Sequence, residues 1–167
     1  MTLKPYCPKS YVLTLDPVWA AEFRAFFMGE GCATITRRKD KGTILYQPQL
    51  AIRLRDDERP LIEDIVAHLG GMVTKVPKRL SPEGYLTNPA LFWHTVGYPK
   101  IRGIIEATDL ANPVLPAHKR LDIRILYEYI LARYEMPGFR LGAANRAILE
   151  DFHTRLVAVR KYKPFDC

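Results

Sequence analysis

Alternation between apolar and polar side chains in one segment constrains the fold of this chain more than any other feature. Between Ile44 and Arg55, one side of the segment is apolar and carries Leu50, Ile52 and Leu54. The opposite side carries Gln49, Ala51, Arg53 and Arg55. A period of two residues predicts a strand with one buried face and one polar face. Residues 32–38 alternate as well, and the turn-forming residues 39–42 between the two segments predict an antiparallel hairpin.

The rest of the chain predicts helices before, between and after two such strand pairs. Asp16 followed by Pro17 is a favourable helix start, and this helix is expected to end near residue 28, before the following glycines. Later helices are expected at 60–70, from 99, at 119–134 and at 142–160, and the second strand pair at 72–76 and 91–96. The order αββαββα predicts an α+β domain with one four-stranded antiparallel sheet. No repeat or linker divides the chain, so residues 1–167 are expected to form a single domain.

The first helix carries a stripe of small residues. Ala21, Ala25 and Gly29 recur every four residues and therefore lie on one helix face. Small side chains at this spacing allow two helices to approach backbone to backbone, a rule best documented in membranes but geometric in origin. Glu30 follows the stripe directly and stands between two glycines. A carboxylate is disfavoured at the C-terminal end of a helix, a local cost that a bound cation would offset.

Residues 23–31, Phe-Arg-Ala-Phe-Phe-Met-Gly-Glu-Gly, resemble the motif of the LAGLIDADG homing endonucleases, whose eighth position is acidic. The αββαββα order is also similar to the domain of that family, and the resemblance covers most of the chain. It implies a site-specific endonuclease that cuts both strands of double-stranded DNA across the minor groove, at a long pseudo-palindromic site. Family members with one motif per chain act as homodimers, so the single motif here implies a homodimer whose interface includes Ala21, Ala25 and Gly29.

The resemblance assigns Glu30 a catalytic, metal-binding role, with the Gly29 carbonyl as a second ligand. Two Glu30 carboxylates brought together by the paired helices would repel each other, and a divalent cation resolves that repulsion. Mg²⁺, or another divalent cation, is the expected cofactor because it prefers oxygen ligands and activates water. The family also has a basic residue before its next long helix, for which Lys119 is the candidate and His118 or Arg120 the alternatives. A polar residue that orders the catalytic water would be Asp57 or Glu58.

The resemblance implies that one face of the sheet contacts the DNA major groove, and strand parity selects the side chains on that face. The candidates from the two hairpins are Thr34, Thr36, Arg38, Asp40, Gln49, Arg53, Arg55 and Lys75. Arginine and glutamine suit base edges and phosphates. For the strand at 91–96 the pattern leaves the choice between the faces of Trp93 and His94 open, although tryptophan is more often in the core.

Composition favours a nucleic-acid partner and excludes several other classes. The net charge is +7, hence +14 for a dimer, which attracts polyanions. No apolar stretch approaches the about 20 residues needed to cross a bilayer, and residues 1–10 lack the apolar run of a signal peptide, so an intracellular, non-secreted protein located with the DNA is expected. The histidines and three scattered cysteines show no zinc-binding spacing.

Two other functions fit the same sequence. An RNA-splicing maturase would use this fold with intron RNA as a partner, and a cleavage-inactive DNA-binding protein would keep the sheet without the chemistry. The acidic residue at position 30 argues against the inactive protein, since a carboxylate there has little structural use.

Overall fold

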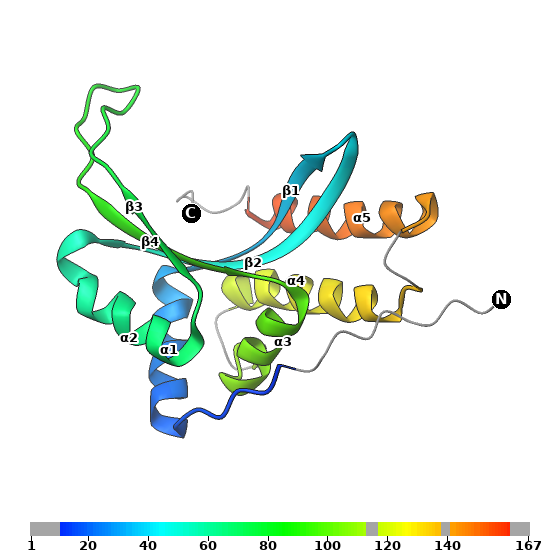
Figure 1. The fold of residues 1–167 in the computed structure, drawn as a ribbon, viewed down its shortest axis with the longest axis horizontal. Coiled ribbons are helices and arrows are strands. Elements are labelled where there is room, and N and C mark those ends of the chain that lie inside the picture. The colour runs from blue at the N-terminus through cyan, green and yellow to red at the C-terminus, as the bar shows by residue number, and fades with distance from the viewer. Residues whose placement is uncertain (1–10, 113–116, 138–140, 161–167) are drawn as a thin grey trace.

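The protein is described here as a computed structural model that covers residues 11–112, 117–137 and 141–160 (Figure 1). The chain runs through α1 (Pro17–Glu30), β1 (Gly31–Asp40), β2 (Thr43–Arg55), a 3-10 turn η1 (Asp56–Glu58), α2 (Arg59–Leu69), β3 (Met72–Val76), β4 (Ala90–Val96), α3 (Tyr98–Ala107), α4 (Ala117–Glu135) and α5 (Ala143–Arg160). The strands form one antiparallel sheet in the order β1-β2-β4-β3. The predicted α+β class with a four-stranded antiparallel sheet is confirmed.

The start of α1 follows from its capping residue. An Asp16 carboxylate oxygen accepts hydrogen bonds from the main-chain N–H groups of Val18 at 2.9 Å and Trp19 at 3.0 Å, and Pro17 occupies the first helical position. These bonds satisfy N–H groups that have no partner within the helix. At the other end, α1 continues two residues beyond the expected end at 28, because the Gly31 N–H still donates to the Phe27 carbonyl.

The β1–β2 turn is tighter than the sequence predicted. Both strands extend into the expected turn, so only Lys41 and Gly42 connect them. Both have positive φ angles, 45° for Lys41 and 83° for Gly42, as a two-residue type I′ turn requires. The long β3–β4 connection is closed by an isolated bridge between Leu80 and Leu86.

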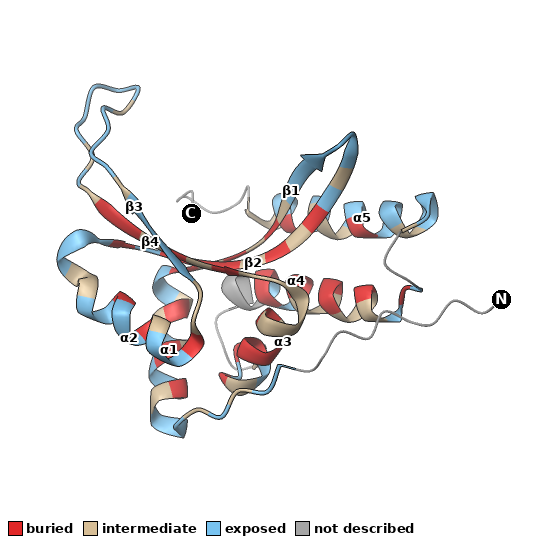
Figure 2. Ribbon diagram, in the orientation of Figure 1, coloured by how far each residue is buried: buried red, intermediate tan, exposed pale blue. Residues whose placement is uncertain are grey.

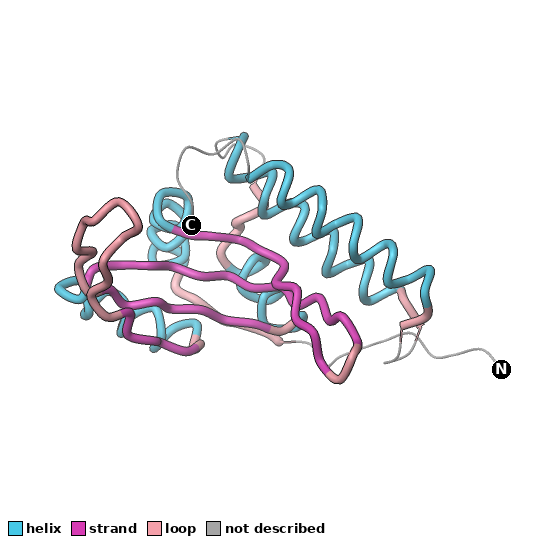
Figure 3. Tube along the Cα trace, turned by 90° about the horizontal axis from the view of Figure 1, so that it is seen from above, coloured by secondary structure: helices cyan, strands magenta, loops and turns pink. Residues whose placement is uncertain are grey.

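The sheet has one covered and one open face. Helices α1 to α4 lie below it in the view of Figure 1, and α5 runs beside the edge strand β1. The covered face provides the core, where Leu50, Ile52 and Trp93 are at most 1% exposed (Figure 2). Seen from above, the four strands are not overlaid by helices (Figure 3). The ends of both hairpins rise on this open side, which we call the outward face.

The helices were compared with the length and apolarity that a membrane span requires. None within the described ranges is both long enough and apolar enough to span a bilayer.

Candidate metal and nucleic-acid site

The acidic motif residue lies at the junction of α1 and the sheet. Glu30 is the last residue of α1 and its side chain is exposed. Gly31 begins β1 without any intervening loop and pairs with Ile52 of β2. The next residue along β2, Arg53, is therefore close to the end of α1 in the strand register. The fold thus brings the motif carboxylate to one end of the outward face.

Gly31 is required here because the backbone passes against the core. A Cβ atom at this position would collide with the ring of Phe27, which is only 1% exposed. Its φ of −79° is ordinary, so the demand is for space rather than for an unusual backbone conformation. This close contact joins the end of α1 to the start of β1 and holds Glu30 between them.

The small-residue stripe faces away from the core. Ala20, Phe23 and Phe27 form the buried side of α1. Ala21, Ala25 and Gly29 are exposed on its other side, and a Cβ atom added at Gly29 would meet nothing within 4 Å. Among the described residues, the stripe therefore lies on the exposed side of α1 and outside the core.

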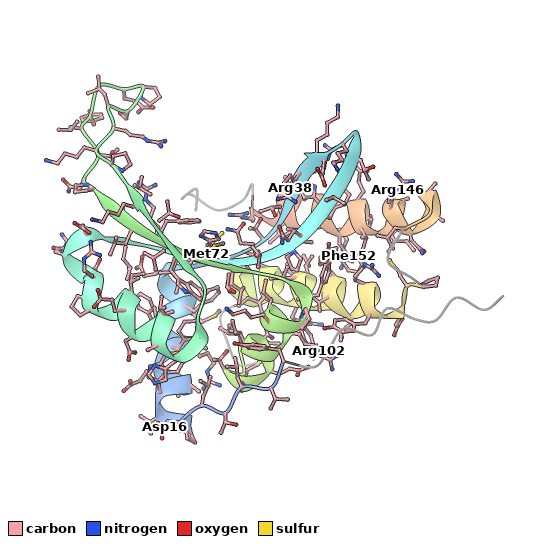
Figure 4. The ribbon with its side chains drawn as sticks, in the orientation of Figure 1. Asp16, Arg38, Met72, Arg102, Arg146 and Phe152 are labelled. Carbon is pink, nitrogen blue, oxygen red and sulfur yellow. The ribbon has the colours of Figure 1, made fainter. Side chains whose placement is uncertain are left out.

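The outward face brings together most of the residues predicted to contact DNA. Cross-strand partners in an antiparallel sheet point to the same side. Thr34 is paired with Gln49, and Arg53 is paired with Phe92 of β4. The predicted residues that lie in this row of the first hairpin are Thr34, Thr36, Arg38, Asp40, Gln49, Arg53 and Arg55. Figure 4 shows Arg38 and Met72 on this side of the sheet, from opposite edge strands.

Lys75 is the one predicted DNA-contacting residue that the structure places elsewhere. It is paired with Leu91, a fully buried residue of the covered face, so its side chain leaves the opposite side of the sheet. Thr74, paired with Phe92, takes the outward position in β3. Lys75 is nevertheless exposed because β3 is an edge strand. The sequence Met-Val-Thr-Lys-Val does not alternate clearly, which is why its parity was misjudged.

The choice left open for β4 is settled by burial. Trp93 is 0% exposed, and its indole N–H donates to the Gly70 carbonyl at 2.8 Å. His94 faces outward, is paired with Ala51, and has its ring stacked at 5.3 Å from that of Phe92. The Nδ1 atom of His94 is buried and has no hydrogen-bond partner among the described residues.

Charged residues at the end of β2 hold one another in place. Glu58 accepts a hydrogen bond from the main-chain N–H of Arg55 at 3.1 Å, and Asp57 lies 3.1 Å from the Arg55 guanidinium. Asp56 is paired with Arg59 at the start of α2. Of the two candidates for ordering a water, Glu58 is therefore engaged with the backbone and Asp57 with a guanidinium. The sequence analysis did not predict the ion pair of Asp56 and Arg59. A signal was present, because three acidic residues directly precede Arg59 at the start of α2.

Lys119 lies in the first turn of α4, together with His118 and Arg120. The side chains of these three residues lie outside the described part of the structure. Further along α4, the Tyr129 hydroxyl donates to the Tyr46 carbonyl oxygen of β2 at 2.8 Å, and the Tyr98 hydroxyl at the start of α3 donates to the same oxygen at 2.8 Å. Burial raises the pKa of Tyr129, so it remains a protonated donor.

The oxygen donors at the end of α1 suit Mg²⁺. Among the described residues, no group of three or more histidine, cysteine, aspartate or glutamate side chains lies together. One chain offers the Glu30 carboxylate beside the Gly29 main-chain carbonyl. Mg²⁺ binds through one or two carboxylates and fills its remaining positions with water and phosphate oxygens. The donor chemistry at the end of α1 therefore fits Mg²⁺.

Gln47 and Arg160 are among the outward-facing residues that the sequence analysis missed. Gln47 is paired with Thr36 and continues the alternation of Gln49 and Arg53, so parity could have found it. Arg160, at the end of α5, hydrogen bonds to β1, and no local sequence signal points to a contact 126 residues away.

The αββαββ arrangement, the open sheet and the acidic residue at the end of α1 define the LAGLIDADG homing endonuclease fold, and the resemblance seen in the sequence is confirmed at the level of the fold. Among solved structures, the archaeal intron-encoded homing endonuclease I-Vdi141I, complexed with DNA, matches with a TM-score of 0.66 at 15% identity, over 89% of this chain and 89% of that one. The homing endonuclease I-CvuI, in complex with its target in the presence of calcium, gives a TM-score of 0.62 at 16% identity, over 90% and 85%.

The same fold also occurs in longer chains. The LAGLIDADG homing endonuclease I-GzeII, in complex with a DNA target, gives a TM-score of 0.63 at 18% identity. The match covers 90% of this chain but only 50% of that one. No protein-family model matches the sequence, and neither does any curated protein. The likeness is therefore one of structure.

Proposed function

We propose that this chain is a site-specific endonuclease that cuts both strands of double-stranded DNA, as a Mg²⁺-dependent homodimer. The observation that carries the proposal is the position of Glu30. It stands at the junction between an exposed small-residue stripe and an open, arginine-bearing sheet face. The stripe and most of the arginine-bearing row are exposed in the described part of the chain, so together they would supply an assembly surface, a metal ligand and a DNA-binding surface.

The stripe supports assembly about a two-fold axis. In such an interface the same surface is used by both subunits, so two α1 helices would meet through Ala21, Ala25 and Gly29. Glu30 directly follows the stripe, and the two copies of its carboxylate would lie near the axis. The lengths of the structural neighbours are consistent with a dimer, because the match covers 89% of I-Vdi141I but only 50% of I-GzeII. A single domain from each of two chains would then correspond to the doubled length.

The proposed chemistry assigns the oxygen donors to metal and the lysine to the phosphate. Glu30 and the Gly29 carbonyl would hold Mg²⁺, which when bound polarises the scissile phosphate and lowers the pKa of water. Lys119 would stabilise negative charge that develops on the phosphate. Asp57 is better placed than Glu58 to order a water, because Glu58 is held by the Arg55 N–H. Asp57 retains acceptor capacity beside the Arg55 guanidinium.

The outward face supports DNA as the partner. Arg53 is exposed and has no carboxylate within 4.0 Å among the described residues, so its guanidinium is available to a base edge or a phosphate. Thr34, Gln49 and Arg38 extend the row along the hairpin. A net charge of +7 per chain favours association with a polyanion. A two-fold dimer would recognise a long pseudo-palindromic site. The proposed location of the protein is inside the cell, with its DNA.

The decisive experiment compares two glutamate substitutions on a randomised plasmid library with Mg²⁺, followed by sequencing of cut ends. Glu30→Gln keeps the shape of the side chain but removes the ligand charge, so cleavage should vanish while DNA binding survives. Glu63→Gln, an exposed position on α2, is the matched control and should cut like the wild type. Cleavage by Glu30→Gln at a comparable rate would remove Glu30 from the metal site.

The same assay separates the competing functions. A wild-type protein that binds duplex DNA without cutting it would be a cleavage-inactive DNA-binding protein on this fold. Preferential binding of structured intron RNA over duplex DNA would point instead to a maturase.

A further inference from the structure

The last helix places a guanidinium on the outward face from outside the sheet. Earlier in α5, Glu150 lies 3.8 Å from Arg37, and His153 packs at a ring distance of 5.7 Å from Tyr46. Arg37 and Tyr46 belong to the covered side of the first hairpin by strand parity. Further along the same helix, the guanidinium of Arg160 crosses the β1 edge. Figure 1 shows this end of α5 next to β1.

The contacts of Arg160 fix its position on the outward face. Nη1 donates to the Thr34 hydroxyl at 2.9 Å, and Nη2 lies 2.8 Å from the Cys32 sulfur. Both partners belong to the outward row of β1. Cys32 is two residues beyond Glu30, a separation of at most about 7 Å between their Cα atoms. The guanidinium therefore lies at the end of the sheet that carries the motif carboxylate.

The charge of Arg160 is not neutralised by its partners. A thiol and a hydroxyl are neutral acceptors, and within the described ranges no carboxylate lies within 4.0 Å of this guanidinium. By contrast, Arg155 on the same helix faces Glu128 at 3.4 Å. An arginine has five N–H donors, and the contacts with Thr34 and Cys32 use two of them. Because Thr34 and Cys32 position the guanidinium without neutralising it, the positive charge of Arg160 remains available to an anion.

We propose that Arg160 is a phosphate-binding residue for DNA, supplied by α5 and positioned by Thr34 and Cys32, at the end of the outward face nearest Glu30. The inference rests on the proposed function for its choice of polyanion. It adds a contact that comes from neither the sheet nor the motif helix. Since the contact is to the backbone, it positions the duplex beside Glu30 without reading its sequence.

Salt dependence distinguishes a phosphate contact from a structural tie. Each neutralised phosphate contributes about 0.9 to the slope of log affinity against log salt. A dimer of Arg160→Ala loses two contacts, so between about 50 and about 200 mM salt the wild type should lose about 12-fold more affinity than the variant. Arg160→Lys keeps the charge and should retain the wild-type slope.

The measurement uses full-length protein in EDTA, with fluorescent duplexes of target and of unrelated sequence, for Arg160→Ala, Arg160→Lys and the matched control Arg155→Ala. We expect the slope to change for Arg160→Ala alone, equally on both duplexes. If Arg160→Ala does not fold, Arg160→Gln, which keeps hydrogen-bond donors without charge, takes its place and should show the same reduced slope.

The outcomes separate this inference from the proposed function. An unchanged slope in the uncharged variant, with only a lowered melting temperature, means that Arg160 merely ties α5 to β1 and overturns the inference. That result leaves cleavage by the wild type untouched. Conversely, a wild type that never cuts DNA but shows the expected slope difference defeats the nuclease proposal and retains the phosphate contact. A wild type with no affinity for duplex DNA refutes both.

Discussion

Replacing Ala25 with leucine separates the folding of one chain from its assembly. Ala25 lies in the middle of the stripe and is exposed in the single chain, where the buried side of α1 is formed by Ala20, Phe23 and Phe27. A substitution at such a surface position changes the free energy of unfolding by about 0.5 kcal/mol or less. Leucine is also a good helix former, so α1 itself should remain intact.

The effect on the dimer should be far larger. Overpacking a tight contact costs about 1–3 kcal/mol, and a two-fold interface counts the change twice. The expected loss is therefore about 2–6 kcal/mol of association free energy, which corresponds to a dissociation constant raised about 30-fold to about 20,000-fold. Cleavage needs both Glu30 carboxylates in this proposal, so it should fall with the dimer while weak half-site binding persists.

Sedimentation at micromolar concentration measures the association, and thermal unfolding of the monomer checks the fold. Ala147→Leu makes the same substitution on an exposed position of α5 and should leave the sedimentation profile unchanged. An Ala25→Leu protein that stays a dimer and still cuts DNA would refute the reasoning. The stripe would then be an ordinary exposed helix surface, and another surface would have to form the interface.

Three further substitutions test the site and its frame. Arg53→Ala should weaken binding by about 1–3 kcal/mol at one or a few base-pair positions in each half-site, measured by competition with single-base variants of the target; uniform loss at all positions would mean a phosphate contact. Lys119→Ala should slow single-turnover cleavage far more than it weakens binding, and equal losses of rate and affinity would contradict its role. Gly31→Ala should lower the free energy of unfolding by about 1–3 kcal/mol, because the added Cβ would meet the Phe27 ring. Gly29→Ala is the control and should not lower it, because a Cβ there meets nothing within 4 Å. Similar melting curves for the two variants would contradict the packing argument.

Local periodicity was sufficient for the elements and for the sheet face on which most of the candidate site residues lie. The alternation in β2 correctly separated Leu50 and Ile52 from Arg53, because burial on one face of a sheet imposes a period of two. Asp16 marked the start of α1, because its carboxylate accepts hydrogen bonds from main-chain N–H groups two and three residues later. The motif with Glu30 indicated the fold from the sequence alone. Each of these signals lies within a few residues of the feature that it predicts.

Only the tertiary structure could decide the features that depend on long-range pairing. Lys75 lies on the covered side because of its register with Leu91, and the weakly alternating sequence of β3 does not encode that register. The stripe could have packed against another helix of the same chain, and its exposure became visible only when the other face of α1 was found in the core. Arg160 reaches Thr34 across 126 residues. Such contacts arise when elements pack together, so sequence patterns determined which side chains could act, and tertiary packing determined which of them meet.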